Sequence, residues 1–208
     1  MKVAVIGASG RTGHLLVEEL LRRGHLVTAL VRDPVRLGDL AGRVTVVMGD
    51  SRKDLEPLVA GTDAVLSALG PTRKEPALHQ DSAAALIAAM REHGVRRFIG
   101  ISGAGIDVPG DRKSPRDRVI SALIQRLGGK VVADKPTEYR AWAASDLDWT
   151  LVRPPRLKDG RATGRVEHDG HRSVRATSIR RADLAGFLAD VLEQNLYPRL
   201  APFVGEAR

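Results

Sequence analysis

The sequence predicts an α/β protein: a doubly wound parallel sheet with helices on both faces, built as a single domain of residues 1–208. Three observations support this class. Short apolar segments alternate with helical segments, and the connections between them are short. The length of 208 residues suits one domain better than two. Hydrophobic residues make up 43% and charged residues 28% of the chain, which are globular proportions.

The first half alternates regularly between strands and helices. Lys2–Ile6 is a short apolar run that ends at a glycine, as is typical of a buried parallel strand. A helix is predicted over Thr12–Arg23, because its leucines share one face and Gly24 follows as a stop. The same alternation then predicts strands at His25–Val31, Val44–Val47, Ala64–Ala68 and Arg97–Ser102, and helices at Asp54–Ala60 and Pro76–His93.

The second half is less regular and contains two candidate substrate loops. Ser102–Asp117 holds three glycines and two prolines, and Leu157–Arg172 is polar and glycine-rich, so the first predicts a long loop and the second a loop or hairpin flap. We expect the regions of about 103–118 and 155–172 to lie on the substrate side. The other predicted elements are helices at Pro115–Leu127, Lys130–Ala144 and Arg181–Gln194, and strands at Trp149–Val152, at Val174–Ile179 and near Phe203.

A glycine-rich loop, GASGRTG at residues 7–13, joins the first strand to the first helix. Glycines there permit a tight turn, a close approach to a pyrophosphate and close packing of helix on strand, while the helix N-terminus faces the anion. The spacing G-x-x-G-x-x-G is one residue longer than the usual dinucleotide fingerprint. The loop therefore predicts a Rossmann-type dinucleotide site. The alternative is a tight turn without a ligand, although three glycines at a helix start are destabilising unless they are used.

The residue that contacts the adenosine ribose should lie about 20 positions further on, at the end of the second strand. Arg32 and Asp33 occupy that place. A guanidinium suits the 2′-phosphate of NADP, whereas a carboxylate would suit the free hydroxyl of NAD, so NADP is favoured over NAD. Arg11 could join Arg32 at the phosphate. The alternative is that Arg32 pairs with Asp33 or with another surface carboxylate.

The net charge of +8 allows two interpretations: a polyanion partner, or a phosphate-bearing cofactor on an arginine-rich background. Only 3 Phe, 2 Trp and 2 Tyr are present, too few to favour base stacking, so nucleic acid is not the expected partner. Much of the excess lies between Leu151 and Arg181, where nine basic and three acidic residues give 9 − 3 = +6. This charge favours a small-molecule substrate that is anionic; the alternative is that these residues are part of the arginine-rich background.

Several classes of protein are excluded or disfavoured. The chain has no cysteine, which excludes thiol chemistry and disulfides. No apolar run approaches the length of about 18 residues that crosses a bilayer, and the start MKVAVIG is too short for a secretory signal, so a cytoplasmic protein with no membrane contact is expected. No metal site is expected, because His168 and His171 have no third ligand near them in the sequence.

These motifs resemble the atypical short-chain dehydrogenases/reductases, in particular the NmrA-like NAD(P)-binding group and its flavin reductase / biliverdin-IXβ reductase type. The segments that carry the resemblance are GASGRTG at 7–13, LVRDPVRL at 30–37, VMGDSRKDLEPLVAGTDAVLSALG at 47–70, AAMREHGVRRFIGIS at 88–102, DLDWTLVRPPRL at 146–157 and SIRRADLAGFL at 178–188. The resemblance implies phosphate contacts from Gly7, Ser9, Gly10, Arg11, Thr12 and Gly13. It further implies Arg32 at the 2′-phosphate, Asp50 and Ser51 at adenine, Leu69 and Gly70 on the adenosine side, and Ser102, Lys135 and Pro154 near the nicotinamide.

The chain departs from the family at the catalytic tyrosine. Standard members carry Tyr-x-x-x-Lys, in which the lysine helps the tyrosine to protonate a carbonyl oxygen. Lys135 stands near the lysine position, but Val131 precedes it by four residues. Neither Tyr139 nor Tyr197 is followed by a lysine at that spacing. An alcohol or ketone oxidoreductase of the usual kind is therefore not expected.

Hydride transfer to a planar acceptor, such as a flavin or a quinone, does not need that tyrosine, because the acceptor can take its proton from water. We expect an NADPH-dependent reductase with Ser102 and Lys135 as catalytic residues; the alternatives are that Ser102 is a satisfied turn residue and that Lys135 forms a helix-surface ion pair with Asp134 or Glu138. His79 at a helix start is expected to be incidental. The alternative function is a non-catalytic NADP-binding redox sensor. The sequence does not predict an oligomeric state.

Overall fold

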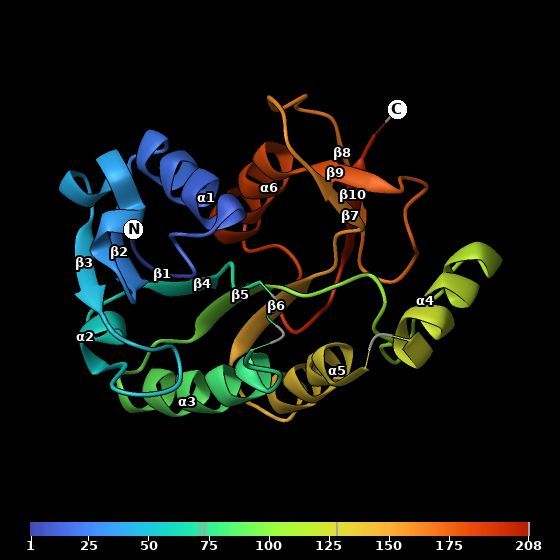
Figure 1. Ribbon diagram of the computed structural model, residues 1–208, viewed down its shortest axis with the longest axis horizontal. Coiled ribbons are helices and arrows are strands. Elements are labelled where there is room, and N and C mark those ends of the chain that lie inside the picture. Colours follow the sequence, from blue (N-terminus) through green and yellow to red (C-terminus); the bar gives the residue numbers. More distant parts are fainter. Residues whose placement is uncertain (71, 73, 128, 208) are drawn as a thin grey trace.

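The computed structural model describes residues 1–70, 72, 74–127 and 129–207, with the side chains of residues 124, 125, 127 and 129–133 left aside. Its centre is a six-stranded parallel sheet in the order β3-β2-β1-β4-β5-β6 (Figure 1). The strands are β1 (Lys2–Ile6), β2 (Leu26–Val31), β3 (Thr45–Met48), β4 (Ala64–Ser67), β5 (Arg97–Ile101) and β6 (Asp148–Val152). The predicted Rossmann-type α/β fold is confirmed.

Helices cover both faces of this sheet, as Figure 1 shows. On one face α1 (Arg11–Arg22) packs against α6 (Arg181–Glu193), and on the other α3 (Leu78–Glu92) packs against α5 (Gly129–Ala143). The short helix α2 (Glu56–Val59) lies beside α3. Because both faces of the strands are covered, β4 is fully buried, and two hydrophobic clusters form on opposite sides of the sheet.

Two further elements complete the fold: a 3₁₀ segment whose Leu37 and Leu40 join the core on the α1 face, and one projecting helix. A 3₁₀ segment, η1 (Pro34–Gly42), follows β2 and begins where the Asp33 carboxylate accepts a hydrogen bond from the amide of Val35. The sequence analysis did not predict this segment, which is nine residues long and is interrupted at Gly38, where φ is +53°. Helix α4 (Pro115–Leu127) projects away from the sheet (Figure 1). Among the described residues, no helix combines the length and the apolar character needed to traverse a bilayer.

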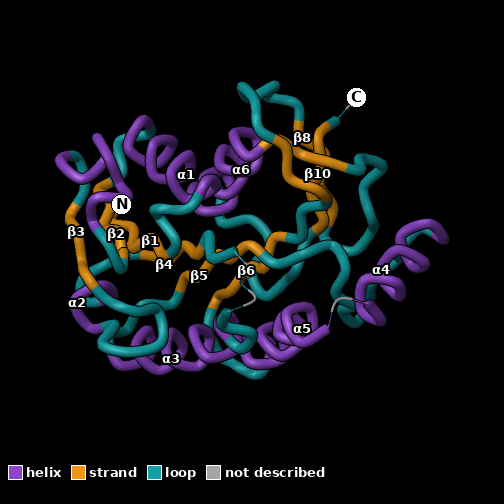
Figure 2. The backbone as a smooth tube through the Cα atoms, viewed as in Figure 1, coloured by secondary structure: helices purple, strands orange, loops and turns teal. Residues whose placement is uncertain are grey.

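The C-terminal half contains two small sheets that the sequence did not predict (Figure 2). Strand β7 (Arg156–Lys158) pairs in parallel with β9 (Ser178–Arg180), and β8 (Val166–Asp169) pairs antiparallel with β10 (Phe203–Glu206). Residues 159–165 form the expected loop, but β7 and β8 on either side of it do not pair with each other, so the hairpin alternative was wrong. The strand expected at 174–179 begins only at Ser178. These strands are three or four residues long and pair with distant segments, so no local periodicity marks them.

The strand order places a crevice at one edge of the sheet. From β1 the chain adds β2 and then β3 on one side, and it then crosses to the other side of β1 to add β4, β5 and β6. The direction in which strands are added therefore reverses between β1 and β4. In open parallel sheets, ligands bind outside the carboxyl ends of the strands at such a reversal. The glycine-rich loop follows β1 and so lies at this point.

Candidate functional site

The glycine-rich loop is a tight turn that brings α1 close to the end of β1. Gly7 has a φ of +76°, and the amide of Gly10 donates to the carbonyl oxygen of Gly7 over 3.0 Å. A Cβ atom at Gly13 would lie only 2.0 Å from that same oxygen, so only glycine fits there. Within the described chain no side chain caps the start of α1, so its amide groups face the crevice. The loop has the form of a phosphate cradle.

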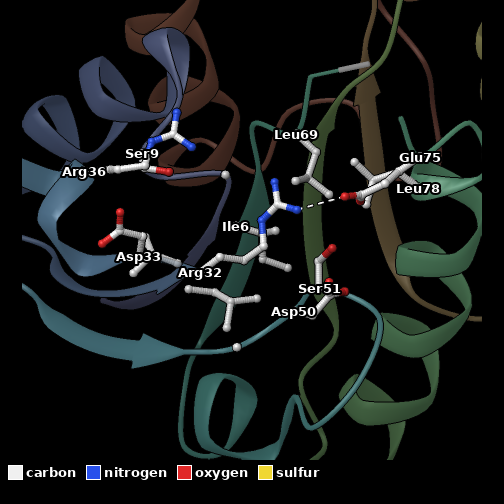
Figure 3. A pocket seen from close by; sticks show the side chains of 14 residues that line it. Ile6, Ser9, Arg32, Asp33, Arg36, Asp50, Ser51, Leu69, Glu75 and Leu78 are labelled. Carbon is white, nitrogen blue, oxygen red and sulfur yellow. Dashed lines mark hydrogen bonds and ion pairs between the residues drawn. The ribbon is translucent and has the colours of Figure 1, made fainter. Parts of the chain in front are cut away.

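On the β2 and β3 side of the loop lies a cavity of about 90 Å³, here called the Arg32 pocket (Figure 3). It contains six of the predicted cofactor residues: Gly7, Ser9, Arg32, Asp50, Ser51 and Leu69. Arg36 on η1 and Glu75, which precedes α3, also line it, and the sequence analysis had assigned neither. Glu75 lies 43 residues from Arg32, so no local pattern could have identified it.

Three charged residues of the Arg32 pocket, Arg32, Glu75 and Asp50, are engaged in ion pairs. Arg32 donates to Glu75 over 2.9 Å. Arg32 therefore pairs with a carboxylate other than Asp33, which was one of the alternatives to a role at the 2′-phosphate. Arg52 binds both oxygens of Asp50, and these hydrogen bonds lower the pKa of that carboxyl below its usual value. The hydroxyl of Ser51 is buried against that of Ser82 at 2.7 Å.

Arg11 was expected to join Arg32, but its guanidinium lies 3.5 Å from Asp159. Both side chains are largely exposed, so this ion pair contributes little to stability. The reason for the difference is the geometry of α1: Arg11 is its first residue and faces the segment after β7 rather than the end of β2. Arg36, which lines the Arg32 pocket, is the second guanidinium there.

On the other side of the loop lies a cavity of about 240 Å³, the Lys135 pocket. It is lined by the three residues expected near the nicotinamide, Ser102, Lys135 and Pro154. Thr12, expected at the phosphates, and Leu69 and Gly70, expected on the adenosine side, line it as well. Leu69 lines both pockets, so they flank the same short stretch after β4. Eleven of the fourteen predicted site residues line one of these two pockets. Gly10 and Gly13 belong to the glycine-rich loop between the pockets, and Arg11 faces Asp159.

Lys135 is held by three acceptors. Its ammonium group contacts His79 Nδ1 at 2.8 Å, the carbonyl oxygen of Ile101 at 3.0 Å and a carboxylate oxygen of Glu138 at 3.0 Å. An ammonium group has three N–H donors, so these acceptors account for all of them. The ion pair with Glu138 therefore exists, but it is buried and not on the helix surface.

His79 and Glu138 belong to this cluster, although neither was predicted to act at the site. Burial, and then the positive charge of Lys135, lower the pKa of His79 to about 3, so its ring is neutral and can accept from the lysine. Burial raises the pKa of the Glu138 carboxyl. Asp134 has a different role, because its carboxylate accepts from the amides of His79 and Gln80 and so caps the start of α3.

Ser102 follows β5 and is 8% exposed. Its amide donates to the carbonyl oxygen of Val152 over 2.8 Å, which fixes the backbone against β6. Its hydroxyl oxygen is buried and has no hydrogen-bond partner among the residues that the structure describes. Ser102 is thus not a satisfied turn residue. A buried polar atom without a partner, in a wall of the Lys135 pocket, fits a bound ligand.

A third cavity, the Phe203 pocket, continues from the Lys135 pocket, since Gly103, Pro154 and Pro155 line both. It has a volume of about 470 Å³. Its apolar wall consists of Ile120, Pro154, Pro155, Val174, Phe203 and Val204. Both expected substrate-side regions contribute to it, through Ala104 and Arg156 among others.

The basic segment between Leu151 and Arg181 is partly neutralised by internal ion pairs. Arg153 is fully buried, binds both oxygens of Asp111 at 2.7 Å and lies 3.7 Å from the centre of the Phe203 ring. Lys158 pairs with Glu206, and Arg181 pairs with Asp159. Part of the excess positive charge is therefore engaged in ion pairs within the fold and is not available to a substrate.

A phosphate cradle at the strand-order reversal, flanked by two pockets, places the protein in the class of dinucleotide-binding α/β proteins. A sequence model of the family described as NAD(P)H-binding matches residues 7–195. The chain therefore belongs to this NAD(P)H-binding family.

Similar proteins agree with this assignment. YwnB of Bacillus subtilis is 35% identical over 107 residues, which are 50% of this chain and 48% of that one. The 3-diazoavenalumate denitrifying reductase of a Streptomyces species is 42% identical over 87 residues, 42% of this chain and 25% of that one. The aligned segment thus spans about half of the length of YwnB and a quarter of the length of the Streptomyces reductase. A "putative NADH-flavin reductase" from Streptococcus pneumoniae has a similar structure, with a TM-score of 0.82, 26% identity and complete coverage of both chains.

Proposed function

We propose that this protein is an NADPH-dependent reductase that transfers hydride to a planar acceptor such as a flavin or a quinone. The observation that carries this proposal is the apolar Phe203 pocket, which opens into the Lys135 pocket beside the glycine-rich loop. Such a pocket, whose wall surface is largely apolar, suits a flat aromatic ring system. The reductase among the relatives and the streptococcal structure support the same class of reaction.

In this proposal the cofactor spans the crevice. The glycine-rich loop, Ser9 and Thr12 bind the pyrophosphate, and Arg32 with Arg36 binds the 2′-phosphate. Asp50 and Ser51 would lie at the adenine and Leu69 on the adenosine side, whereas Gly70, which was expected there too, lines the Lys135 pocket. Ser102, Lys135 and Pro154 would hold the nicotinamide, and the cofactor would supply the hydride when bound.

The protein's own groups orient the acceptor and stabilise charge. Ser102 donates its unpartnered hydroxyl hydrogen to a carbonyl oxygen of the acceptor or of the nicotinamide. Lys135 has no free N–H, so it acts as a fixed positive charge beside the anion that forms on the acceptor. The Phe203 pocket excludes water from the ring, and the proton comes from solvent at the open end.

The test is the consumption of NADPH by the purified protein with a panel of flavins, quinones and small carbonyls. We expect turnover with planar acceptors and none with simple ketones. Arg156 on the pocket wall favours acceptors that carry an anionic group over neutral ones of the same shape. Tight cofactor binding without turnover on any acceptor would contradict the proposal and favour an NADP-binding redox sensor.

The preference for NADPH is tested by Arg32→Ala. Loss of the guanidinium should weaken NADPH binding by about tenfold or more, because a charge-assisted contact to phosphate contributes roughly 1.5–3 kcal/mol. NADH binding should change less than about twofold, since it has no 2′-phosphate to contact. Calorimetric titration of both nucleotides measures the two affinities. An equal loss for NADPH and NADH would rule out the role of Arg32 at the 2′-phosphate.

A further inference from the structure

An ion pair crosses the Arg32 pocket. Arg32 follows β2, and Glu75 lies in the connection from β4 to α3, so the two residues come from opposite sides of β1. Figure 3 shows their side chains reaching toward each other across the pocket. The Arg32 guanidinium donates to Oε1 of Glu75 over 2.9 Å. The guanidinium that the 2′-phosphate would need is therefore already engaged by a carboxylate.

Glu75 lies between two guanidinium groups. Its second oxygen, Oε2, is buried, has no hydrogen bond to any part of the chain that is described, and lies 3.7 Å from Nη1 of Arg52. Arg52 itself is bound to Asp50, beside the same pocket. The Glu75 side chain is 24% exposed, whereas Arg32 is 66% exposed. Arg32 is thus the partner with room to move, and Arg52 is positioned to retain the carboxylate.

We propose that Glu75 is a specificity-determining residue that competes with the 2′-phosphate of NADPH for Arg32. The inference rests on the proposed function, because it takes Arg32 as the 2′-phosphate contact. A carboxylate and a phosphate offer the same kind of oxygen acceptors to a guanidinium, so one replaces the other. When the phosphate binds, Arg32 turns to it, and Glu75 remains beside Arg52.

This competition affects the two nucleotides differently. NADH has no anion at the 2′ position, so the pair between Arg32 and Glu75 stays intact when NADH binds. NADPH must displace Glu75 and then leaves a carboxylate near its phosphate, and both effects weaken its binding. Glu75 therefore lowers the ratio of the affinity for NADPH to the affinity for NADH.

The experiment compares Glu75→Gln with the unaltered protein by calorimetric titration at low salt. Glutamine keeps the size and the acceptor oxygen but removes the charge. We expect NADPH and adenosine 2′,5′-bisphosphate to bind about two- to fivefold more tightly, since an ion pair with an exposed partner contributes little more than this. NADH and AMP should bind as before. The gain should shrink as salt is raised, because the competition is electrostatic.

Two further variants make the result specific. The exposed Glu92 lies at the far end of α3, so Glu92→Gln removes the same charge away from the pocket and should change neither affinity. In the Arg32→Ala background, Glu75→Gln should give no gain for NADPH, because the group that both anions compete for is gone. Thermal unfolding of each variant verifies that it is folded.

The outcomes separate this inference from the proposed function. If Arg32→Ala selectively weakens NADPH but Glu75→Gln leaves it unchanged or weaker, the competition is wrong and the role of Arg32 stands. Equal gains for NADPH and NADH would also overturn the inference, since Glu75 would then hinder entry of any nucleotide. If NADPH and NADH bind equally well and Arg32→Ala affects neither, both the proposed cofactor preference and the inference fail.

Discussion

At the scale of single residues, the hydroxyl of Ser102 is the most informative atom of the site. A buried hydroxyl without a partner destabilises a protein, because it has given up its bonds to water. Its persistence in a wall of the Lys135 pocket favours a role toward a ligand. If the hydroxyl acts on a ligand, its removal should lower turnover and should not lower stability. If it has a structural role, its removal should lower stability and leave turnover unchanged.

Ser102→Ala should lower the turnover of NADPH with a planar acceptor by about tenfold or more, since one hydrogen bond to the developing charge is lost. The free energy of unfolding should stay equal or rise by up to about 1 kcal/mol, because no hydrogen bond within the protein is broken. Steady-state kinetics and denaturant titration measure the two effects. Ser145 is the matched control: its buried hydroxyl donates to Trp142, so Ser145→Ala should cost stability and leave turnover unchanged.

At the scale of elements, the junction of β1 and α1 determines whether the phosphate cradle exists. Gly13→Ala would place a methyl group 2.0 Å from the carbonyl oxygen of Gly7, so the turn or the helix must shift. We expect the affinities for NADPH and NADH to fall together by about tenfold or more, because both share the pyrophosphate. The free energy of unfolding should drop by roughly 1–3 kcal/mol. Nucleotide titration and urea unfolding measure the two changes.

Gly42 provides the control for this change. A Cβ atom at Gly42, at the end of η1, would meet nothing within 4 Å. Gly42→Ala should therefore leave both affinities unchanged and alter stability by less than about 0.5 kcal/mol. A Gly13→Ala variant that bound nucleotide normally would contradict the assignment of the loop.

The elements also differ in how far local sequence predicts them. The strands of the central sheet and the helices α1, α3 and α6 lie within a few residues of their predicted positions, because each has an apolar repeat of its own. Strands β7 to β9 were missed or misplaced. Their residues are mostly polar, and they become strands only because distant partners pair with them.

At the scale of the whole molecule, buried ionisable groups make stability depend on pH. The pKa of His79 is about 3 in the folded protein, below its ordinary value near 6.5 in an unfolded chain. Between these values the unfolded chain binds one more proton than the folded chain, so stability falls as pH falls from about 6.5 toward 3. The loss from this group is at most about 5 kcal/mol.

His79→Gln tests this dependence, because glutamine can still accept a hydrogen bond from Lys135 but does not titrate. At pH 7 the variant should be less stable than the unaltered protein, and the difference should shrink as the pH is lowered to 4. Urea titrations at several pH values measure it. Glu138, Lys135 and Asp134 surround His79, and the raised pKa of Glu138 acts in the opposite direction in both proteins. A difference that did not vary with pH would refute the role of His79.

Local sequence determined the α/β class, the phosphate loop and the position of Arg32, because each depends on a repeat or a spacing within about 30 residues. The tertiary structure decided what those residues contact. It placed Glu75 on Arg32, His79 and Glu138 on Lys135, and five separate segments around the Phe203 pocket. Such contacts depend on how helices are rotated on the sheet and which strands are neighbours, and these follow from packing of the whole chain rather than from any one segment.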